Sequence, residues 1–124
     1  MIIYRIYTGD DEQSHFEEID VAMEDVSWGK MSALLQTEGM RFRQTPSSGE
    51  MDFHNAPRRQ FLVNLSGEAE IETGDGTTKR FGPGSILLAD DTTGQGHITR
   101  EVGGGRSGLV VPVPDDFDVD SLRG

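Results

Sequence analysis

The chain has 124 residues, of which 22 are acidic and 11 are basic, so its formal net charge at pH 7 is −11. This charge argues against nucleic acid or an anionic membrane as the partner, because both favour clustered lysine and arginine. The absence of cysteine excludes disulfide bonds, a thiol nucleophile and a zinc–thiolate site. A chain of this length can bury a core as one domain without a structural metal.

The chain begins MIIYRIYTGDD, which lacks the basic start and apolar run of a secretory signal. No apolar run in the sequence is long enough to cross a bilayer. We therefore expect a cytoplasmic protein that acts on a small molecule, with neither a membrane nor nucleic acid as its partner.

Short runs of alternating apolar and polar residues predict β-strands in the first part of the chain. These runs cover residues 1–7, 16–23 and 40–45. Residues 27–36 fit either a turn of helix or a strand beginning near Lys30. The sequence PSSG at 46–49 ends the third run, because proline and glycine interrupt strands.

The clearest strand pair lies in the middle of the chain. At 61–65 (FLVNL) the odd positions are apolar, and at 68–73 (EAEIET) glutamates alternate with Ala69 and Ile71, which we expect to face inward. The sequence GDG at 74–76 predicts a hairpin turn, because Asp-Gly pairs accept positive φ readily.

Further runs predict strands at residues 77–81, 85–89, 96–102 and 108–113. The acidic tail at 114–124 is expected to be loosely held. Many short strands separated by glycine and proline turns, with no long helix between them, predict one all-β domain over residues 1–124, either a sandwich or a small barrel.

The segment from His54 to Gly67 resembles the first motif of the cupin superfamily, whose members are small jelly-roll barrels. That motif reads His-x-His, three or four residues, Glu, six residues, Gly. The chain keeps this spacing with His54, Ala56, Gln60 and Gly67.

The second cupin motif is matched more loosely, from Gly84 to His97. Asp90 and Thr92 stand where proline and glycine are usual, and the loop to His97 is longer than the pattern. The resemblance covers about residues 50–113 and implies a single-domain cupin jelly-roll barrel. It implies little about function, because this barrel carries many activities.

The resemblance implies a metal site of three histidines and a carboxylate that binds a divalent transition metal. On the matching positions this chain keeps only His54 and His97; Ala56 cannot be a ligand, and Gln60 offers a neutral amide oxygen. A site made of His54, Gln60 and His97 could hold Ni, Zn, Fe or Mn, but it lacks the negative charge that a carboxylate supplies. We therefore expect a weak metal site or none.

Gln60, Leu62 and Asn64 lie two residues apart and share one face of their strand, which is the interior face in the cupin arrangement. An asparagine inside a barrel needs a hydrogen-bond partner, a water molecule or a ligand. With His54 and His97 these residues would form a polar cluster in an otherwise apolar cavity, which is typical of a small-molecule site. The alternative is that the polar groups satisfy one another around trapped water.

Two further candidates for ligand binding are Arg58 and Thr93. Arg58 could clamp a carboxylate or a phosphate at the mouth of the barrel, or it could pair with a surface carboxylate. The loop at 90–96 is either an ordinary connection or a rim or lid with Thr93 or Asp91 facing the ligand.

Three functions remain open from the sequence. The first is an enzyme of isomerase, cyclase or lyase type, with His54 or His97 as general base and Gln60 or Asn64 holding an oxyanion. A variant of it is a metal-dependent oxygenase or isomerase. The second is a non-catalytic ligand binder or sensor, and the third is a structural protein with only water inside.

The sequence also predicts a homodimer, as cupins usually pair through their sheets. The odd positions Phe61, Val63 and Leu65 form an apolar face, which a second sheet, the N-terminal strands or a partner subunit must cover.

Overall fold

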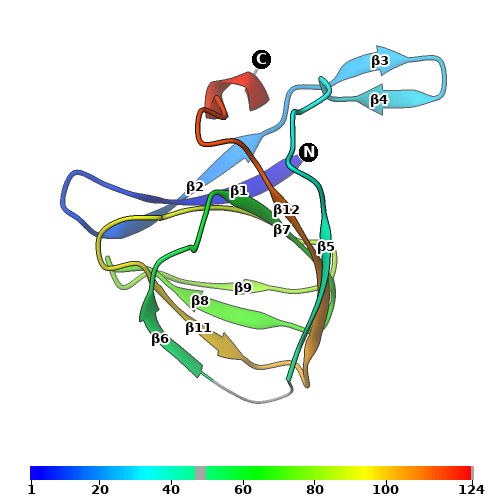
Figure 1. Cartoon of the computed structure of the whole chain (residues 1–124). Coiled ribbons are helices and arrows are strands. Elements are labelled where there is room, and N and C mark those ends of the chain that lie inside the picture. Colours follow the sequence, from blue (N-terminus) through cyan, green and yellow to red (C-terminus); the bar gives the residue numbers. More distant parts are fainter. Residues whose placement is uncertain (47–49, 124) are drawn as a thin grey trace.

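A computed structural model describes residues 1–46 and 50–123 of the chain (Figure 1). The strands before the first cupin-like motif are β1 (Ile2–Thr8), β2 (Ser14–Asp20), β3 (Glu24–Val26), β4 (Gly29–Met31), β5 (Arg41–Thr45) and β6 (Glu50–His54). They are followed by β7 (Gln60–Ser66), β8 (Ala69–Glu72), β9 (Thr78–Phe81), β10 (Ile86–Asp90), β11 (His97–Glu101), β12 (Arg106–Pro112) and the 3-10 helix η1 (Val119–Leu122). The expectation of an all-β fold is confirmed.

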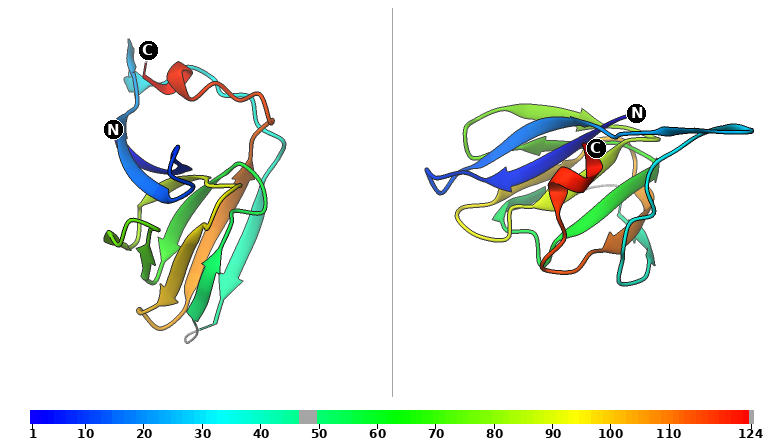
Figure 2. Two further views of the ribbon diagram at one scale, coloured as in Figure 1. Left: turned by 90° about the vertical axis from the view of Figure 1, so that its left-hand side faces the viewer. Right: turned by 90° about the horizontal axis from the view of Figure 1, so that it is seen from above.

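Two sheets form the body of the molecule. The larger has the strand order β2-β1-β10-β7-β12-β5, and the smaller has the order β6-β11-β8-β9. They face each other as a barrel of the jelly-roll type (Figures 1 and 2). β1 lies parallel to β10, whereas β7 is antiparallel to both of its neighbours, β10 and β12.

Strand alternation places the side chains as the sequence predicts. On β8, Ala69 and Ile71 are buried between the sheets, and the glutamates between them are more exposed. Gly76 has a φ of +87° in the turn that joins β8 to β9, so the predicted hairpin is confirmed. The sheet interior also holds Phe81 and Leu87, which pack in the same apolar cluster as Ile71.

The opposite face of β7 is covered by the C-terminal segment. Phe61 shares a core cluster with Leu122 of η1, and the rings of Phe61 and Phe117 meet edge to face with centroids 5.8 Å apart. The same cluster contains Ile3 of β1 and Ile19 of β2, so the N-terminal strands, one of the coverings expected for this face, contribute to it together with the C-terminal segment. Leu65, at the end of the strand, stays exposed.

The expectation of a loosely held tail is wrong. Leu122 is only 2% exposed, and its carbonyl accepts a hydrogen bond of 2.8 Å from the Ala22 backbone N–H. The Arg59 guanidinium donates to the carbonyls of Asp115 and Phe117. The acidic side chains of the tail lie on its outer side, and apolar side chains anchor it to the core. The spacing of these apolar residues in the sequence does not predict that they are buried. Within 1–46 and 50–123, no helix is both long and apolar enough to span a membrane.

The sequence prediction does not include β3 and β6, and it leaves residues 27–36 open between a helix and a strand. Residues 27–36 contribute β4, which with β3 forms a hairpin that projects from the barrel (Figures 1 and 2), so the strand alternative holds and the helical one does not. β6 has the sequence EMDFH, in which polar and apolar residues alternate, but its apolar side chains, Met51 and Phe53, are exposed and not part of the core.

Candidate active site

A cavity of about 320 Å³ opens between the two sheets. Its lining includes four of the residues that the sequence singles out: His54, Gln60, Leu62 and His97. Gln60 and Leu62 come from β7 of the larger sheet, and the histidines come from β6 and β11 of the smaller one. The structure therefore brings these four side chains to one place.

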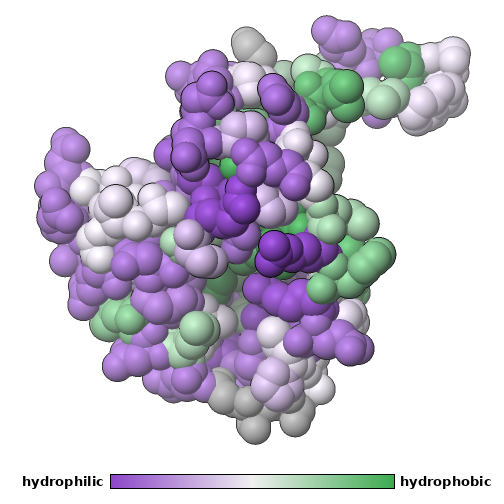
Figure 3. Space-filling model, in the orientation of Figure 1, coloured by the Kyte–Doolittle hydropathy of each residue, from purple (hydrophilic) through white to green (hydrophobic). Residues whose placement is uncertain are grey.

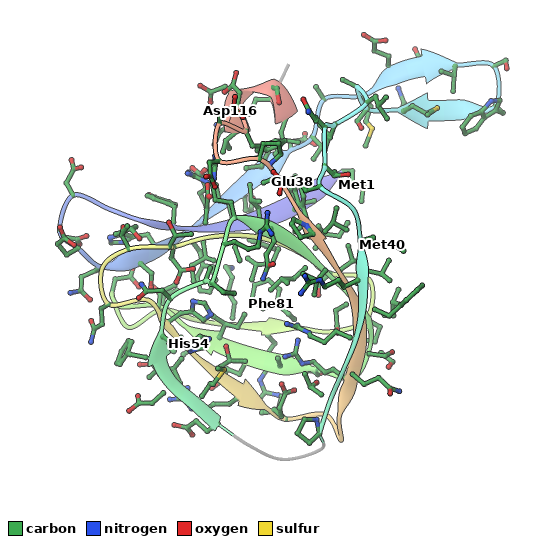
Figure 4. The ribbon with its side chains drawn as sticks, in the orientation of Figure 1. Met1, Glu38, Met40, His54, Phe81 and Asp116 are labelled. Carbon is green, nitrogen blue, oxygen red and sulfur yellow. The ribbon has the colours of Figure 1, made fainter. Side chains whose placement is uncertain are left out.

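The two histidines form a contacting pair. His54 ends β6, His97 begins β11, and the two residues are direct partners in the register of these antiparallel strands. Their ring centroids lie 4.4 Å apart at an interplanar angle of 58°. Figure 4 shows His54 at the end of its strand, on the side of the barrel away from Met40. His97 is the more enclosed of the two, with 6% of its surface exposed.

The buried carboxylate of Asp91 is hydrogen-bonded to the His97 ring. Asp91 is fully buried, and its Oδ2 accepts a hydrogen bond of 2.5 Å from His97 Nδ1. A carboxylate can only accept, so Nδ1 carries the proton and the other ring nitrogen, Nε2, is the basic atom of a neutral His97. The second carboxylate oxygen of Asp91, Oδ1, has no hydrogen-bond partner among the described residues.

His54 has the same tautomer for a different reason. Its Nδ1 lies 2.9 Å from the backbone carbonyl oxygen of Asp52, which can only accept a hydrogen bond. Nε2 of His54 is therefore also free of a proton in the neutral ring. Two imidazoles on the cavity wall thus each keep an available basic nitrogen.

The loop at 91–96 is fastened in place, which fixes the position of Asp91. The side-chain amide of Asn55 donates to the backbone carbonyls of Asp91, Thr93 and Gly94 at 3.3, 2.8 and 3.0 Å. The Thr8 hydroxyl donates to the same Thr93 carbonyl at 2.9 Å. This segment is a fixed rim of the barrel and not a free lid.

Gly96 allows the rim to approach the strand that carries His54. Its φ is +79°, and a Cβ built on it would lie 1.9 Å from the backbone oxygen of His54. The carbonyl of Gly96 accepts a hydrogen bond of 2.6 Å from the buried Ser14 hydroxyl. A side chain at this position would push apart the two strands that hold the histidines.

Asn64 lies outside the cavity that contains the histidines. Its amide donates to the backbone carbonyls of Gly67 at 2.8 Å and Phe81 at 3.3 Å. It lines a small hollow of about 30 Å³ that adjoins the cavity and shares Leu62 and Arg43 with its lining. The structure thus gives Asn64 backbone partners of its own.

Arg58 and Thr93 are also placed away from the cavity. Arg58 forms an ion pair with Glu38, and both side chains are about half exposed. The side chain of Thr93 lies on an exposed part of the rim, and its backbone carbonyl is the group that the neighbours bind. Of the two interpretations of Arg58, the structure agrees with the ion pair to a surface carboxylate.

The cavity contains charged residues that the sequence reasoning missed. Arg106 and Glu101 form a two-pronged ion pair, with both N–O distances at 2.7 Å. Arg43 lines the cavity beside them. Its burial, and then the positive charge of Arg106, lower the pKa of Arg43, whereas Glu101 acts in the opposite direction. Alternation in the sequence RFRQT at 41–45 could not have revealed it, because it predicts apolar Phe42 inside and Arg43 outside, the reverse of what the structure shows.

The donor set does not fit a resident transition metal. His54, His97 and Gln60 supply two imidazoles and one neutral amide, and the described residues contain no group of three or more His, Cys, Asp or Glu arranged to hold a metal ion. The cavity carboxylates are already paired, Glu50 with Arg100 and Glu101 with Arg106. No carboxylate is left to offset the charge of the ion.

Solved structures with a similar shape were found, at low similarity. The conserved SPY1581 protein of unknown function from Streptococcus pyogenes has a TM-score of 0.48 and 25% identity, over 68% of this chain and 71% of that one. Protein NMB1881 from Neisseria meningitidis has a TM-score of 0.48 and 14% identity, over 64% and 79%. The cupin domain of Cnp3 from Schizosaccharomyces pombe has a TM-score of 0.43 and 11% identity, over 92% and 83%. Neither a family model nor a curated protein matches the sequence, and at these TM-scores the likenesses assign neither a family nor a function.

Proposed function

We propose that this chain is a small cupin-type enzyme that moves a proton on a small molecule bound in the barrel, without a resident metal. The reaction is of the isomerase, cyclase or lyase type, and His97 is its general base. The observation that carries the proposal is the hydrogen bond between buried Asp91 and His97 on the wall of the cavity.

The proton transfer begins at a carbon next to a carbonyl group of the substrate. His97 Nε2 takes the proton, and the electron pair of the broken C–H bond moves onto the carbonyl oxygen. Gln60 lines the same cavity, and its amide can donate to that developing oxyanion. Return of the proton to a different atom, from His97 or through His54, completes an isomerisation with no co-reactant.

Asp91 makes His97 a better base by two effects. Its hydrogen bond keeps the proton on Nδ1 and so leaves Nε2 free, and its negative charge stabilises the imidazolium that forms when Nε2 takes the substrate proton. The other oxygen of this buried carboxylate, Oδ1, has no hydrogen-bond partner among the described residues, which is unusual for a purely structural group and favours a chemical role.

The test is exchange of substrate hydrogen with solvent deuterium. A panel of small carbonyl compounds is incubated with the protein in D2O, and loss of the C–H signal is followed by proton NMR. We expect exchange with at least one compound, reduced by about a hundredfold or more in His97→Gln. His15→Gln is the matched control, because His15 lies outside the cavity.

Binding without exchange would contradict the enzyme proposal and favour the ligand binder.

The same protein, purified without a histidine tag, is analysed for bound metal. We expect less than one metal ion per chain. A stoichiometric metal that is lost in both His54→Ala and His97→Ala would contradict a metal-free site.

A further inference from the structure

Arg43 differs from most arginines of this chain in its charge environment. Most of the others form ion pairs with carboxylates, as Arg5, Arg80 and Arg106 do. Arg41 on the same strand forms none with the described residues, but its side chain is exposed to water. Among the described residues, Arg43 has no hydrogen-bonded or ion-paired carboxylate, although the chain has twice as many acidic as basic residues. A partly buried guanidinium without a counterion is unfavourable, so this position favours an anion from outside the chain.

The cross-strand neighbour of Arg43 is a glycine. Arg43 on β5 pairs with Gly108 on β12, and directly opposed residues of antiparallel strands project to the same face of the sheet. Gly108 has no side chain there, and a Cβ built on it would lie 2.5 Å from the Val63 backbone oxygen. The Arg43 side chain therefore has a glycine as its cross-strand neighbour on the cavity side.

The charges of the cavity lining favour a ligand with one negative charge. Arg106 is paired with Glu101, and Glu50 shares Arg100 with Glu70 and Glu72, so Arg43 is the arginine of the described lining that has no ion-paired carboxylate of its own. A second negative charge on the ligand would lie near Glu101 and Glu50, which repel it. A planar guanidinium also matches the two oxygens of a carboxylate.

We propose that the substrate is a small monocarboxylate, whose carboxylate binds Arg43 while its carbonyl-bearing carbon lies at the His54–His97 pair. This inference rests on the proposed proton transfer and adds the class of molecule on which it acts. The two ends of the site come from different sheets, Arg43 from β5 and the histidines from β6 and β11. The distance between the sheets then selects the length of the substrate.

The test measures binding of monocarboxylates and of neutral molecules of the same shape. The probes are pyruvate, 2-oxobutanoate and 4-oxopentanoate, each compared with its primary amide, and inorganic phosphate. Binding is followed by NMR titration of 15N-labelled protein. We expect at least one of the carboxylates to bind more tightly than its amide and more tightly than phosphate.

Substitutions on β5 then assign the binding to Arg43. Arg43→Gln weakens carboxylate binding by about tenfold or more. Arg43→Lys keeps the positive charge but lacks the planar guanidinium that can donate two parallel hydrogen bonds, and it weakens binding less. Arg41→Gln is the matched control, because Arg41 lies on the same strand but is exposed. Thermal melting of each variant checks that it is folded. The inference is overturned if none of the three carboxylates binds, if phosphate binds best, or if Arg43→Gln binds as wild type does.

The failure of this inference can be separated from failure of the proposed enzyme. Carboxylate binding that depends on Arg43, with no deuterium exchange, would support the anchor and contradict the proton transfer. Deuterium exchange that depends on His97 but proceeds equally on the amides and in Arg43→Gln would support the proton transfer and overturn the anchor.

Discussion

Asp91 and His97 show how one buried contact determines the chemistry of a residue. An isolated neutral imidazole can carry its proton on either nitrogen, and the partner of one nitrogen decides the matter. Here a carboxylate accepts from His97 Nδ1, and the Asp52 backbone carbonyl accepts from His54 Nδ1. The availability of both Nε2 atoms for chemistry is therefore a property of the surroundings and not of the histidines alone.

The first prediction is that both His54 and His97 carry their proton on Nδ1 and that only His97 changes in Asp91→Ala. The side-chain partner of His97 is then lost, whereas the backbone partner of His54 remains. We expect the variant to lose about 1–3 kcal/mol of unfolding free energy, because a buried donor is left unsatisfied. Long-range 15N NMR of the imidazole rings measures the tautomers, and a wild-type His97 protonated on Nε2 would contradict the structure.

The second prediction concerns the pH dependence of stability at His15. Hydrogen bonding to Asp11, and then to Asp75, raises the pKa of His15 above its ordinary value of 6.5. The stabilisation is fully present below that ordinary value and is lost as pH rises through the raised pKa of the folded protein. It is expected to stay within about 1 kcal/mol because the ion pairs are partly exposed to solvent.

Urea unfolding of wild type and His15→Gln between about pH 5.5 and about pH 9 measures this effect. Wild type is expected to be the more stable at the acidic end, with the difference shrinking toward the basic end. Asp75 acts at lower pH, because the Thr73 hydroxyl above all lowers its pKa to about 2. Its contribution is present above its ordinary value of 3.8 and is lost as pH falls toward 2. A difference between the proteins that grows with pH would contradict the raised pKa of His15.

At the scale of elements, the rim at 91–96 connects the chemistry to the sheets. It joins β10 to β11, carries Asp91 at its start and is followed directly by His97. Asn55, which directly follows β6, donates hydrogen bonds to three of its backbone carbonyls. The geometry of the Asp91–His97 hydrogen bond thus depends on a loop whose own backbone is held by side-chain hydrogen bonds.

The third prediction compares two glycines with nearly the same backbone conformation. Gly96 and Gly104 have φ of +79° and +80°, but only Gly96 is close to another backbone atom, the His54 oxygen. Gly104→Ala is expected to lower the unfolding free energy by about 1 kcal/mol, because a side chain is strained at a positive φ. Gly96→Ala adds the clash and is expected to lower it by about 3 kcal/mol or more. Urea unfolding measures both, and equal losses would contradict the close approach of the rim to β6.

At the scale of the whole molecule, the exposed apolar side chains form a pattern. The hairpin of β3 and β4 projects from the barrel, with Trp28 at its tip 74% exposed. Apolar residues also gather over β5 (Figure 3), where Met40 and Phe42 are exposed, Phe42 by 82%. An isolated two-stranded hairpin is only marginally stable in water, so this pattern favours a second subunit as its support.

The fourth prediction is that the protein is a homodimer in which the hairpin is covered. Trp28 is the only tryptophan of the chain, so its fluorescence reports on that surface. Dilution is expected to shift its emission to the red as sedimentation equilibrium shows dissociation. Trp28→Ser is expected to raise the dissociation constant by about tenfold or more, whereas Leu65→Ser, another exposed apolar residue, changes it little. A monomer at all concentrations would contradict the prediction.

The sequence by itself determined those features that depend on local period. The alternation on β7 and β8 predicted which side chains share a face of each strand. That His54 and Gln60 line one cavity was implied by the resemblance to a cupin motif and not by the local period. The predictions from alternation succeeded because the backbone of a strand fixes the direction of each side chain over a few residues.

The tertiary structure decided what depends on contacts between distant segments. It brought Asp91 into hydrogen-bond contact with His97 and paired Arg58 with Glu38. It also left Arg43 without an ion-paired carboxylate in the described cavity lining. It also packed Leu122 of the acidic tail into the core. Each of these depends on which strands become neighbours, and strand order is set by the burial of the whole chain and not by the period of any one segment.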